Sequence, residues 1–293
     1  MIDLELNSST DLKREGKSFY WASFFLPKSS KKNAGILYSI CRYFDDIADK
    51  HSQDQSNYLK NSIEEIKNNK NNKVNVFLKK NNINNAIFID LIDGLILDQK
   101  NIRIQNKEEL IKYSYHVAGT VGLMMSKIIG VKHLNAAKSA IDLGIAMQLT
   151  NIARDVYEDS KMERIYLPAN WLPNVSLKYL NNKRELDLKN DEKISNAIQK
   201  VISLSEEFYK NGFAGLKYIP FSSRLGIFIA ANVYRGIGIK IKSNKKKYFR
   251  ERVYLNSFEK SYITIKSIFF FILLPLINYQ YQKIRDSLPN ENL

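Results

Sequence analysis

Two pairs of aspartates are the residues of this chain whose type and spacing could do chemistry. Asp45 and Asp49 lie four residues apart in "LYSICRYFDDIAD". Asp155 and Asp159 have the same spacing in "QLTNIARDVYEDSKMERIYLP". Side chains four residues apart share one face of a helix, so each pair sets two carboxylates side by side. Because like charges at this spacing repel, we expect a positive group to be bound between them.

Each pair continues a longer polar stripe at helical spacing. The first stripe adds Tyr38 and Arg42, and the second adds Gln148 and Asn151, with Glu158 beside it. One such stripe would be ordinary for a solvated helix face. The second stripe, however, is a narrow band between apolar side chains, which is typical of a face that lines an internal cavity. Two matching stripes in one chain therefore favour a bound cation.

Mg²⁺ meets the requirements of such a site. It is a hard ion that is held by one or two carboxylates together with the oxygens of a substrate phosphate. The sequence therefore predicts two Mg²⁺-diphosphate sites, with Mn²⁺ as a second candidate ion, and Arg42, Arg154 and Arg164 are available to neutralise phosphate charge. Glycoside hydrolysis, which also uses two carboxylates, needs one protonated acid opposite one base and fits these twinned motifs less well.

The elements that must position these faces are predicted to be helices. Only 12 Gly and 6 Pro interrupt the 293 residues, and apolar positions recur at spacings of three and four rather than two. This predicts an all-α helical bundle around a central cavity, as a single domain over residues 1–293. Helical segments are expected at 34–48, 86–97, 111–129, 137–156, 194–217 and 224–241. Breaks are expected at 26–33, 68–85, 128–135, 167–174 and 242–249.

Composition restricts the partners and the compartment. The 45 Lys and Arg against 30 Asp and Glu give a formal charge of +15, which favours nucleic acid, a phosphorylated substrate or an acidic membrane surface. A single cysteine, Cys41, excludes a disulfide framework within the chain and any site built from several cysteines. The first residues lack the order of a secretory signal. We therefore expect a cytoplasmic protein.

The C-terminal region suggests contact with a membrane surface. The apolar run 268–277 is too short for the roughly 20 residues that span a bilayer, and Pro275 interrupts it. Together with the basic segment 242–252 it is typical of peripheral attachment, here to the inner face of the membrane. A buried helix is the other interpretation of the run. A basic helical protein that binds nucleic acid or membrane without catalysis is a further alternative, although the acidic stripes would repel nucleic acid.

The two aspartate motifs resemble the signatures of the squalene and phytoene synthase family, the head-to-head prenyl synthases. Three other segments, "GKSFYWASFFLP", "YSYHVAGTVG" and "AANVYRGIGIKI", also resemble family segments and occur in the expected order. The resemblance extends from about residue 16 to residue 260. It implies the isoprenoid synthase helical fold and a prenyl diphosphate substrate, with no role in binding nucleic acid.

The resemblance also implies roles for the residues at matching positions. Asp45 and Asp49 would bind Mg²⁺ at the first diphosphate, and Asp155 and Asp159 at the second, with Glu158 at a further acidic position. Diphosphate-contacting or pocket positions are matched by Arg42, Gln148, Asn151, Arg154, Arg164, Tyr166, Tyr234 and Arg252. Positions near the reacting ends of the substrates are matched by Ser18, Phe19 and Tyr113. Core packing would explain Phe19 and Tyr234 equally well.

Within the family, "RIYLPANWL" and residues 209–241 resemble bacterial phytoene synthases most. This implies that two geranylgeranyl diphosphates condense to phytoene through a cyclopropylcarbinyl diphosphate, without a nicotinamide cofactor. Squalene or presqualene diphosphate synthesis from farnesyl diphosphate is the alternative. The allylic cation of such a reaction must be kept from water, and the aromatic rings of Phe19, Tyr38 and Tyr113 could stabilise it.

Overall fold

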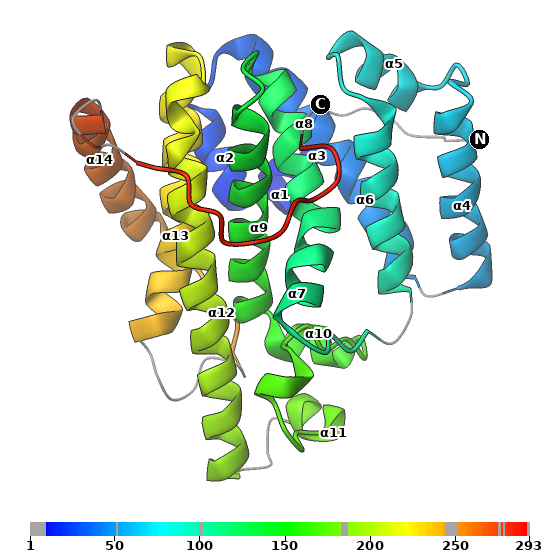
Figure 1. The fold of residues 1–293 in the computed structure, drawn as a ribbon, viewed down its shortest axis with the longest axis vertical. Coiled ribbons are helices and arrows are strands. Elements are labelled where there is room, and N and C mark those ends of the chain that lie inside the picture. Colours follow the sequence, from blue (N-terminus) through cyan, green and yellow to red (C-terminus); the bar gives the residue numbers. More distant parts are fainter. Residues whose placement is uncertain are drawn as a thin grey trace.

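Helices account for the regular structure of this chain in the computed structural model, which describes residues 10–50, 52–99, 102–182, 187–243, 251–274, 277 and 279–291 (Figure 1). The α-helices are α1 (Thr10–Arg14), α2 (Lys17–Ser23), α3 (Lys28–Ala48), α4 (Gln53–Lys67), α5 (Lys73–Lys80), α6 (Asn85–Asp98), α7 (Lys107–Ser114), α8 (Thr120–Ile128), α9 (Ala136–Arg154), α10 (Val156–Lys161), α11 (Leu177–Asn181), α12 (Leu188–Ala214), α13 (Phe221–Ser243) and α14 (Ser257–Leu273). A π-helical turn η1 (Tyr115–Gly119) and two 3₁₀ turns, η2 (Ala169–Trp171) and η3 (Leu216–Tyr218), complete them. The predicted all-α fold class is confirmed, whereas the single-domain organisation stays a prediction.

Helix α9 is the central element, because it contacts α7, η1, α8, α12 and α13. Apolar side chains such as Ile145, Ala146 and Leu149 cover most of its circumference and are fully buried. Gly144 lets the backbone of η1 approach closely, since a Cβ there would lie 2.2 Å from the carbonyl oxygen of Ala118. The helix that leads into the second aspartate motif is therefore held rigidly from several sides.

The predicted helical segments are all found, but three boundaries differ. The region 111–129 is interrupted by η1, where the helix widens into one π turn. The break expected at 26–33 is wrong for most of its length, because α3 begins at Lys28, with Lys28, Ser29 and Lys32 exposed and Ser30 buried in its first turns. The tract 68–85 contains α5, whose N-terminus is capped by the side chain of Asn72 on the backbone N–H of Asn75, 2.9 Å away.

The C-terminal segment 279–291 crosses the outside of the bundle as an irregular strap, drawn in red in Figure 1. Arg285 anchors it through a 2.7 Å ion pair with Asp142, a residue of α9 that is completely buried. The amide of Asn290 donates to Asp90 on α6 over 2.7 Å. These contacts fasten the end of the chain to the two helices that flank the motif-bearing region.

Candidate active site

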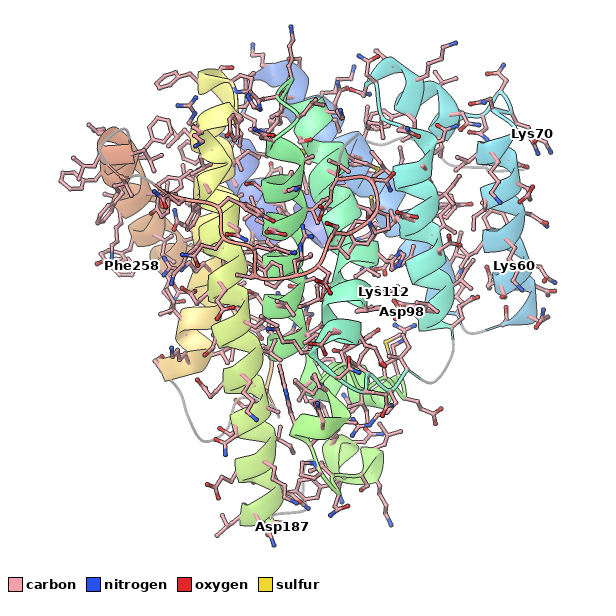
Figure 2. All side chains as sticks on the ribbon, viewed as in Figure 1. Lys60, Lys70, Asp98, Lys112, Asp187 and Phe258 are labelled. Atoms are coloured by element: carbon pink, nitrogen blue, oxygen red, sulfur yellow. The ribbon has the colours of Figure 1, made fainter. Side chains whose placement is uncertain are left out.

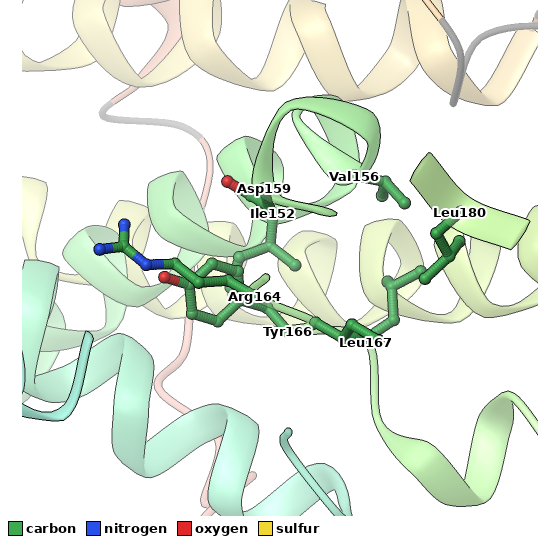
Figure 3. A pocket seen from close by; sticks show the side chains of 8 residues that line it. Ile152, Val156, Asp159, Arg164, Tyr166, Leu167 and Leu180 are labelled. Carbon is green, nitrogen blue, oxygen red and sulfur yellow. The ribbon is translucent and has the colours of Figure 1, made fainter. Parts of the chain in front are cut away.

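Arg164 joins the two aspartate motifs, which are far apart in the sequence. Its Nη1 atom lies 2.8 Å from Oδ1 of Asp49, a residue 115 positions earlier that caps the C-terminus of α3. The guanidinium is 7% exposed, and its Nε also donates to the backbone oxygen of Asp98 over 3.1 Å. Figure 3 shows Arg164, Asp159 and Tyr166 around one small pocket of about 10 Å³. The two motifs therefore meet at one end of the bundle.

Backbone pairing holds the segment that carries Arg164. The N–H of Ile165 donates to the carbonyl of Ile102 over 2.9 Å, and the N–H of Ile104 donates back to Ile165 over 3.2 Å. This short extended contact replaces a helix just where the chain leaves α10. It turns the Arg164 side chain back toward α3, which a continuing helix would not do.

Asp155 is held between two arginines. Nε and Nη2 of Arg154 lie 2.8 and 2.6 Å from its two carboxylate oxygens, and Nε of Arg252 lies 2.9 Å from Oδ1. The predicted uninterrupted stripe is corrected here, because α9 ends at Arg154 and Asp159 lies on the separate helix α10. The N–H of Asp159 still bonds to the carbonyl of Asp155 over 2.8 Å, which keeps the two residues one turn apart.

The first motif has a parallel arrangement on α3. Arg42 reaches Asp45 over 3.1 Å and the neighbouring Asp46 over 2.6 Å. Burial, followed by the negative charge of Asp49, raises the pKa of Asp45 to about 7. Burial, followed by Asp155, likewise raises the pKa of Asp159 well above its usual range. The arginines at this end of the bundle therefore do not fully compensate the burial and mutual repulsion of its carboxylates.

The donor atoms at this end fit a hard cation that a substrate helps to hold. Oε2 of Glu158 and Oδ1 of Asn151 are buried oxygens that lack a hydrogen-bond partner among the residues that the structure describes. Within the described ranges, no three His, Cys, Asp or Glu side chains converge on one point as a metal site by themselves. Mg²⁺ does not require three, because it keeps waters and takes phosphate oxygens alongside one or two carboxylates. The residues present are thus compatible with a metal that arrives together with a diphosphate.

Two aromatic pairs flank the charged groups. The rings of Phe19 on α2 and Tyr234 on α13 lie 4.6 Å apart, and those of Tyr113 and Tyr166 stack at 4.7 Å. Tyr38 is close to Tyr234. Burial of the Tyr38 phenol is the main cause that raises its pKa, and the electrostatic effect of Tyr234 is the second. The remaining predicted site residues lie on the same elements: half-buried Ser18 next to Phe19, and Gln148, whose Oε1 accepts from Nδ2 of Asn151 over 3.3 Å.

Asp98 is a charged residue of this region that the sequence did not reveal. It ends α6, is 4% exposed, and accepts hydrogen bonds from the hydroxyls of Tyr113 and Tyr166 at 2.9 and 2.7 Å. Burial outweighs these bonds and the nearby Arg164, so its pKa rises to about 6 (Figure 2 labels the residue). Asp98 shares α6 with Asp90 and Asp93 but lies neither three nor four residues from either, so no spacing marks it as one of a pair. The one signal in the sequence was an acidic residue at the end of a helix face that is otherwise apolar.

We expect Asp98→Asn to remove part of the pH dependence of stability. The folded pKa lies above the ordinary 3.8, so the folded protein holds this proton more tightly than the unfolded chain does. The resulting stabilisation is complete below about pH 4 and is lost as pH rises through about 6, at a cost of about 3 kcal/mol. Urea unfolding between pH 4 and 7 should show a smaller decline for the variant.

Asp54→Asn is the matched control, because Asp54 is an exposed acid in the first turn of α4. Its pH profile should follow that of the unchanged protein. The same decline in the Asp98 variant as in the unchanged protein would contradict the assigned role of Asp98.

Comparison with known sequences identifies relatives over most of the chain. The profile of the squalene/phytoene synthase family matches residues 12–259. The 15-cis-phytoene synthase of Enterobacter agglomerans is 32% identical over 266 residues, covering 83% of this chain and 88% of that protein. The phytoene synthase of Pseudescherichia vulneris is 37% identical over 172 residues, which are 59% of this chain and 55% of the relative.

Comparison with solved structures agrees with the sequence matches. A dehydrosqualene synthase in complex with a ligand superposes with a TM-score of 0.77 at 26% identity, over 89% of this chain and 94% of that one. A squalene synthase from Alicyclobacillus acidocaldarius shares the fold at 20% identity, with a TM-score of 0.68 over 80% of this chain and 91% of that one. With its paired aspartate motifs joined through Arg164 and a family profile matching residues 12–259, the chain belongs to the squalene/phytoene synthase family.

Proposed function

We propose that this chain is a phytoene synthase, which joins two geranylgeranyl diphosphates head to head. The observation that carries the proposal is the 32% identity to a 15-cis-phytoene synthase over 88% of its length. The reaction would proceed through a cyclopropylcarbinyl diphosphate, as the family resemblance implies, and would need no nicotinamide cofactor. The enzyme would be a prenyltransferase of carotenoid biosynthesis.

Asp45 and Asp49 would hold the metal at one diphosphate, and Asp155, Glu158 and Asp159 at the other. The family generally uses divalent metal ions, and we propose Mg²⁺ because these donors are carboxylates in a region short of positive charge. When bound, the metal supplies Lewis-acid stabilisation of the departing diphosphate. Raised carboxylate pKa values support this assignment, since they reflect burial first and neighbouring carboxylates second, and a bound cation would offset both effects.

The arginines of the site would bind and orient the diphosphates. Arg154 and Arg252 both engage Asp155, and Arg42 engages Asp45. A guanidinium has five donors, so each can keep one carboxylate contact while another N–H turns to a phosphate oxygen. Asn151 and Gln148, on α9, lie one and two turns before Asp155 and would add neutral donors beside the arginines.

The aromatic side chains would protect the cationic carbon. Phe19, Tyr38 and Tyr234 lie together where α2, α3 and α13 meet, and Phe19 and Tyr38 are only half-buried. Rings that are partly open can offer their negative faces to an allylic cation and exclude water from it. Tyr113 is fixed by Asp98 at the other side of the charged groups.

A non-catalytic nucleic-acid-binding function is the weaker candidate. It depended on the basic segment 242–252, of which residues 244–250 lie outside the described part of the chain. Arg252, at its end, is half exposed and forms an ion pair with Asp155. The carboxylates around Asp155 would repel a polyanion at that place.

The product of the reaction tests the proposed function. Purified protein with Mg²⁺ and geranylgeranyl diphosphate should yield a forty-carbon hydrocarbon, with the same yield whether or not NADPH is present. Parallel incubations with farnesyl diphosphate, analysed by mass spectrometry, supply the comparison. Exclusive use of farnesyl diphosphate, or accumulation of a thirty-carbon cyclopropyl diphosphate, would overturn the phytoene assignment in favour of a squalene-type enzyme.

A further inference from the structure

Helix α14 presents its large apolar side chains to the outside of the molecule. The stripe consists of Phe258, Tyr262, Ile265, Phe269 and Ile272, which are 61 to 80% exposed. Their spacing of four, three, four and three residues places them along a single face. In Figure 1 the helix lies at the edge of the bundle beyond α13, and Figure 2 shows Phe258 on that outer side.

The side of α14 that faces the protein is of mixed polarity. Thr264 and Ser267 are its buried residues, Ile263 and Phe271 are partly buried against the core, and the hydroxyl of Thr264 accepts a 2.9 Å hydrogen bond from the indole N–H of Trp21 on α2. An ordinary surface helix keeps its large apolar side chains on the inside, whereas α14 carries a second set on the outside. The interpretation of the 268–277 run as a buried helix is wrong for four of its described residues, because Ile268, Phe269, Phe270 and Ile272 are all at least 39% exposed, whereas Phe271 and Leu274 are partly buried against the core.

The apolar surface continues beside the helix. A groove of about 590 Å³ runs between α13 and α14, and Phe228, Tyr262 and Phe270 are among the residues that line it. Phe221, at the start of α13, is 73% exposed and its ring lies 5.6 Å from that of Phe271. An apolar surface of this extent on one side of a protein indicates a partner.

The charge on α14 identifies the kind of partner. Its single acidic residue, Glu259, is neutralised by Lys240, whose Nζ lies 2.7 Å from Oε1. Lys260 and Lys266 lie beside the apolar stripe. Burial is the main cause that lowers the pKa of Lys260, and the positive charge of Lys17 on α2 is close enough to lower it further. The surface is thus apolar with a positive border, which matches the headgroups and acyl chains of an anionic bilayer.

A second copy of the chain fits this surface poorly. In a symmetric dimer the same patch would meet itself, so Lys260 and Lys266 of each copy would face like charges on a protein of net charge +15. A spanning segment does not fit either, because no helix in the described ranges is long and apolar enough to cross a bilayer. Helix α14 can lie in the plane of the membrane surface without these costs.

We propose that α14 is a membrane-surface helix, with Phe258, Tyr262, Ile265, Phe269 and Ile272 inserted among the lipids and Lys260 and Lys266 at anionic headgroups. This interaction does not depend on the chemistry of the active site. The sequence predicted attachment to a membrane surface, and this proposal assigns that attachment to α14. The inserted stripe begins ten residues before the run at 268–277 on which that expectation rested.

Vesicle flotation tests the proposal with purified protein and no substrate. Vesicles of phosphatidylglycerol and of phosphatidylcholine are compared at low and high salt. The triple variant Ile265→Ser, Phe269→Ser, Ile272→Ser should bind at least about tenfold more weakly to phosphatidylglycerol vesicles, because it removes three inserted apolar side chains. The control Val76→Ser, Leu97→Ser, Leu134→Ser changes three exposed apolar residues on other parts of the surface and should bind normally.

A second variant separates the charge from the apolar stripe. Lys260→Gln with Lys266→Gln should lower binding to phosphatidylglycerol about tenfold at low salt and leave binding to phosphatidylcholine unchanged. Equal binding of the Ile265, Phe269 and Ile272 variant and the unchanged protein would overturn the proposal, as would failure of the unchanged protein to bind phosphatidylglycerol. Sedimentation velocity without lipid should show monomers. A dimer that the same triple variant abolishes would instead assign the surface to self-association.

Turnover in detergent provides the remaining check. The Ile265, Phe269 and Ile272 variant should turn over prenyl diphosphate in micelles at the rate of the unchanged protein, because none of these residues lies at the charged end of the bundle. A protein that binds vesicles but makes no product would leave the α14 proposal standing and overturn only the proposed function.

Discussion

Asp155→Asn is expected to lower kcat by about a thousandfold or more while the helical fold remains intact. The amide is nearly the same size as the carboxylate, but it cannot supply an anionic ligand to a metal. Asp155 is also the group on which Arg154 and Arg252 converge, so the change removes the negative charge that positions both guanidiniums. Asp45→Asn should have a comparable effect through the first motif. Steady-state kinetics at saturating prenyl diphosphate measure both changes.

Two controls distinguish a chemical defect from unfolding. The circular dichroism of each variant should match that of the unchanged protein. The urea midpoint of Asp155→Asn should fall, because its ion pairs with Arg154 and Arg252 are lost, but the variant should stay folded under the assay conditions. Asp54→Asn, which changes an exposed acid on α4, should retain full activity. Raising Mg²⁺ should not restore the Asp155 variant. Near-normal turnover of both aspartate variants at low Mg²⁺ would eliminate the two-site metal hypothesis.

Arg164→Met is expected to destabilise the metal-free protein by about 3 kcal/mol, because removing one partner of a largely buried ion pair leaves the other charge uncompensated. The charge left behind is Asp49, and it would lie near Asp45, Asp98 and Asp159 with one cation fewer. The carbonyl of Asp98 would lose its donor as well. The free energy of unfolding in urea measures the effect.

Arg14→Met gives the appropriate comparison, because it removes an arginine from an exposed ion pair with Glu15 and should change stability by less than about 1 kcal/mol. The double variant Arg164→Met with Asp49→Asn should recover part of the lost stability, since the uncompensated charge is then gone. Mg²⁺ with inorganic diphosphate should also stabilise the single variant. A loss for Arg164→Met no larger than for Arg14→Met would show that the motifs do not depend on this contact.

The sequence alone was sufficient for the fold class and the two carboxylate pairs, because both depend on local periodicity, and for the family, because several motifs of the chain resemble those of the family. Spacing of three and four residues decides which side chains share a face of a helix, whatever that helix packs against. Thus Asp45 and Asp49, and the residues around Asp155, could be grouped correctly before any contact was known. The helix break at Asp155 was missed, since the chain keeps helical hydrogen bonds on both sides of it.

The tertiary structure decided the contacts between segments distant in the sequence. Arg164 reaches Asp49 across 115 residues and Arg252 reaches Asp155 across 97, and no spacing rule links such positions. Asp98 gains its raised pKa only because packing removes it from water. The apolar run 268–277 left open whether its side chains are buried or contact a membrane, since burial depends on the surface that the rest of the chain offers. In the folded chain Thr264 is buried against the bundle, whereas Phe269 is exposed.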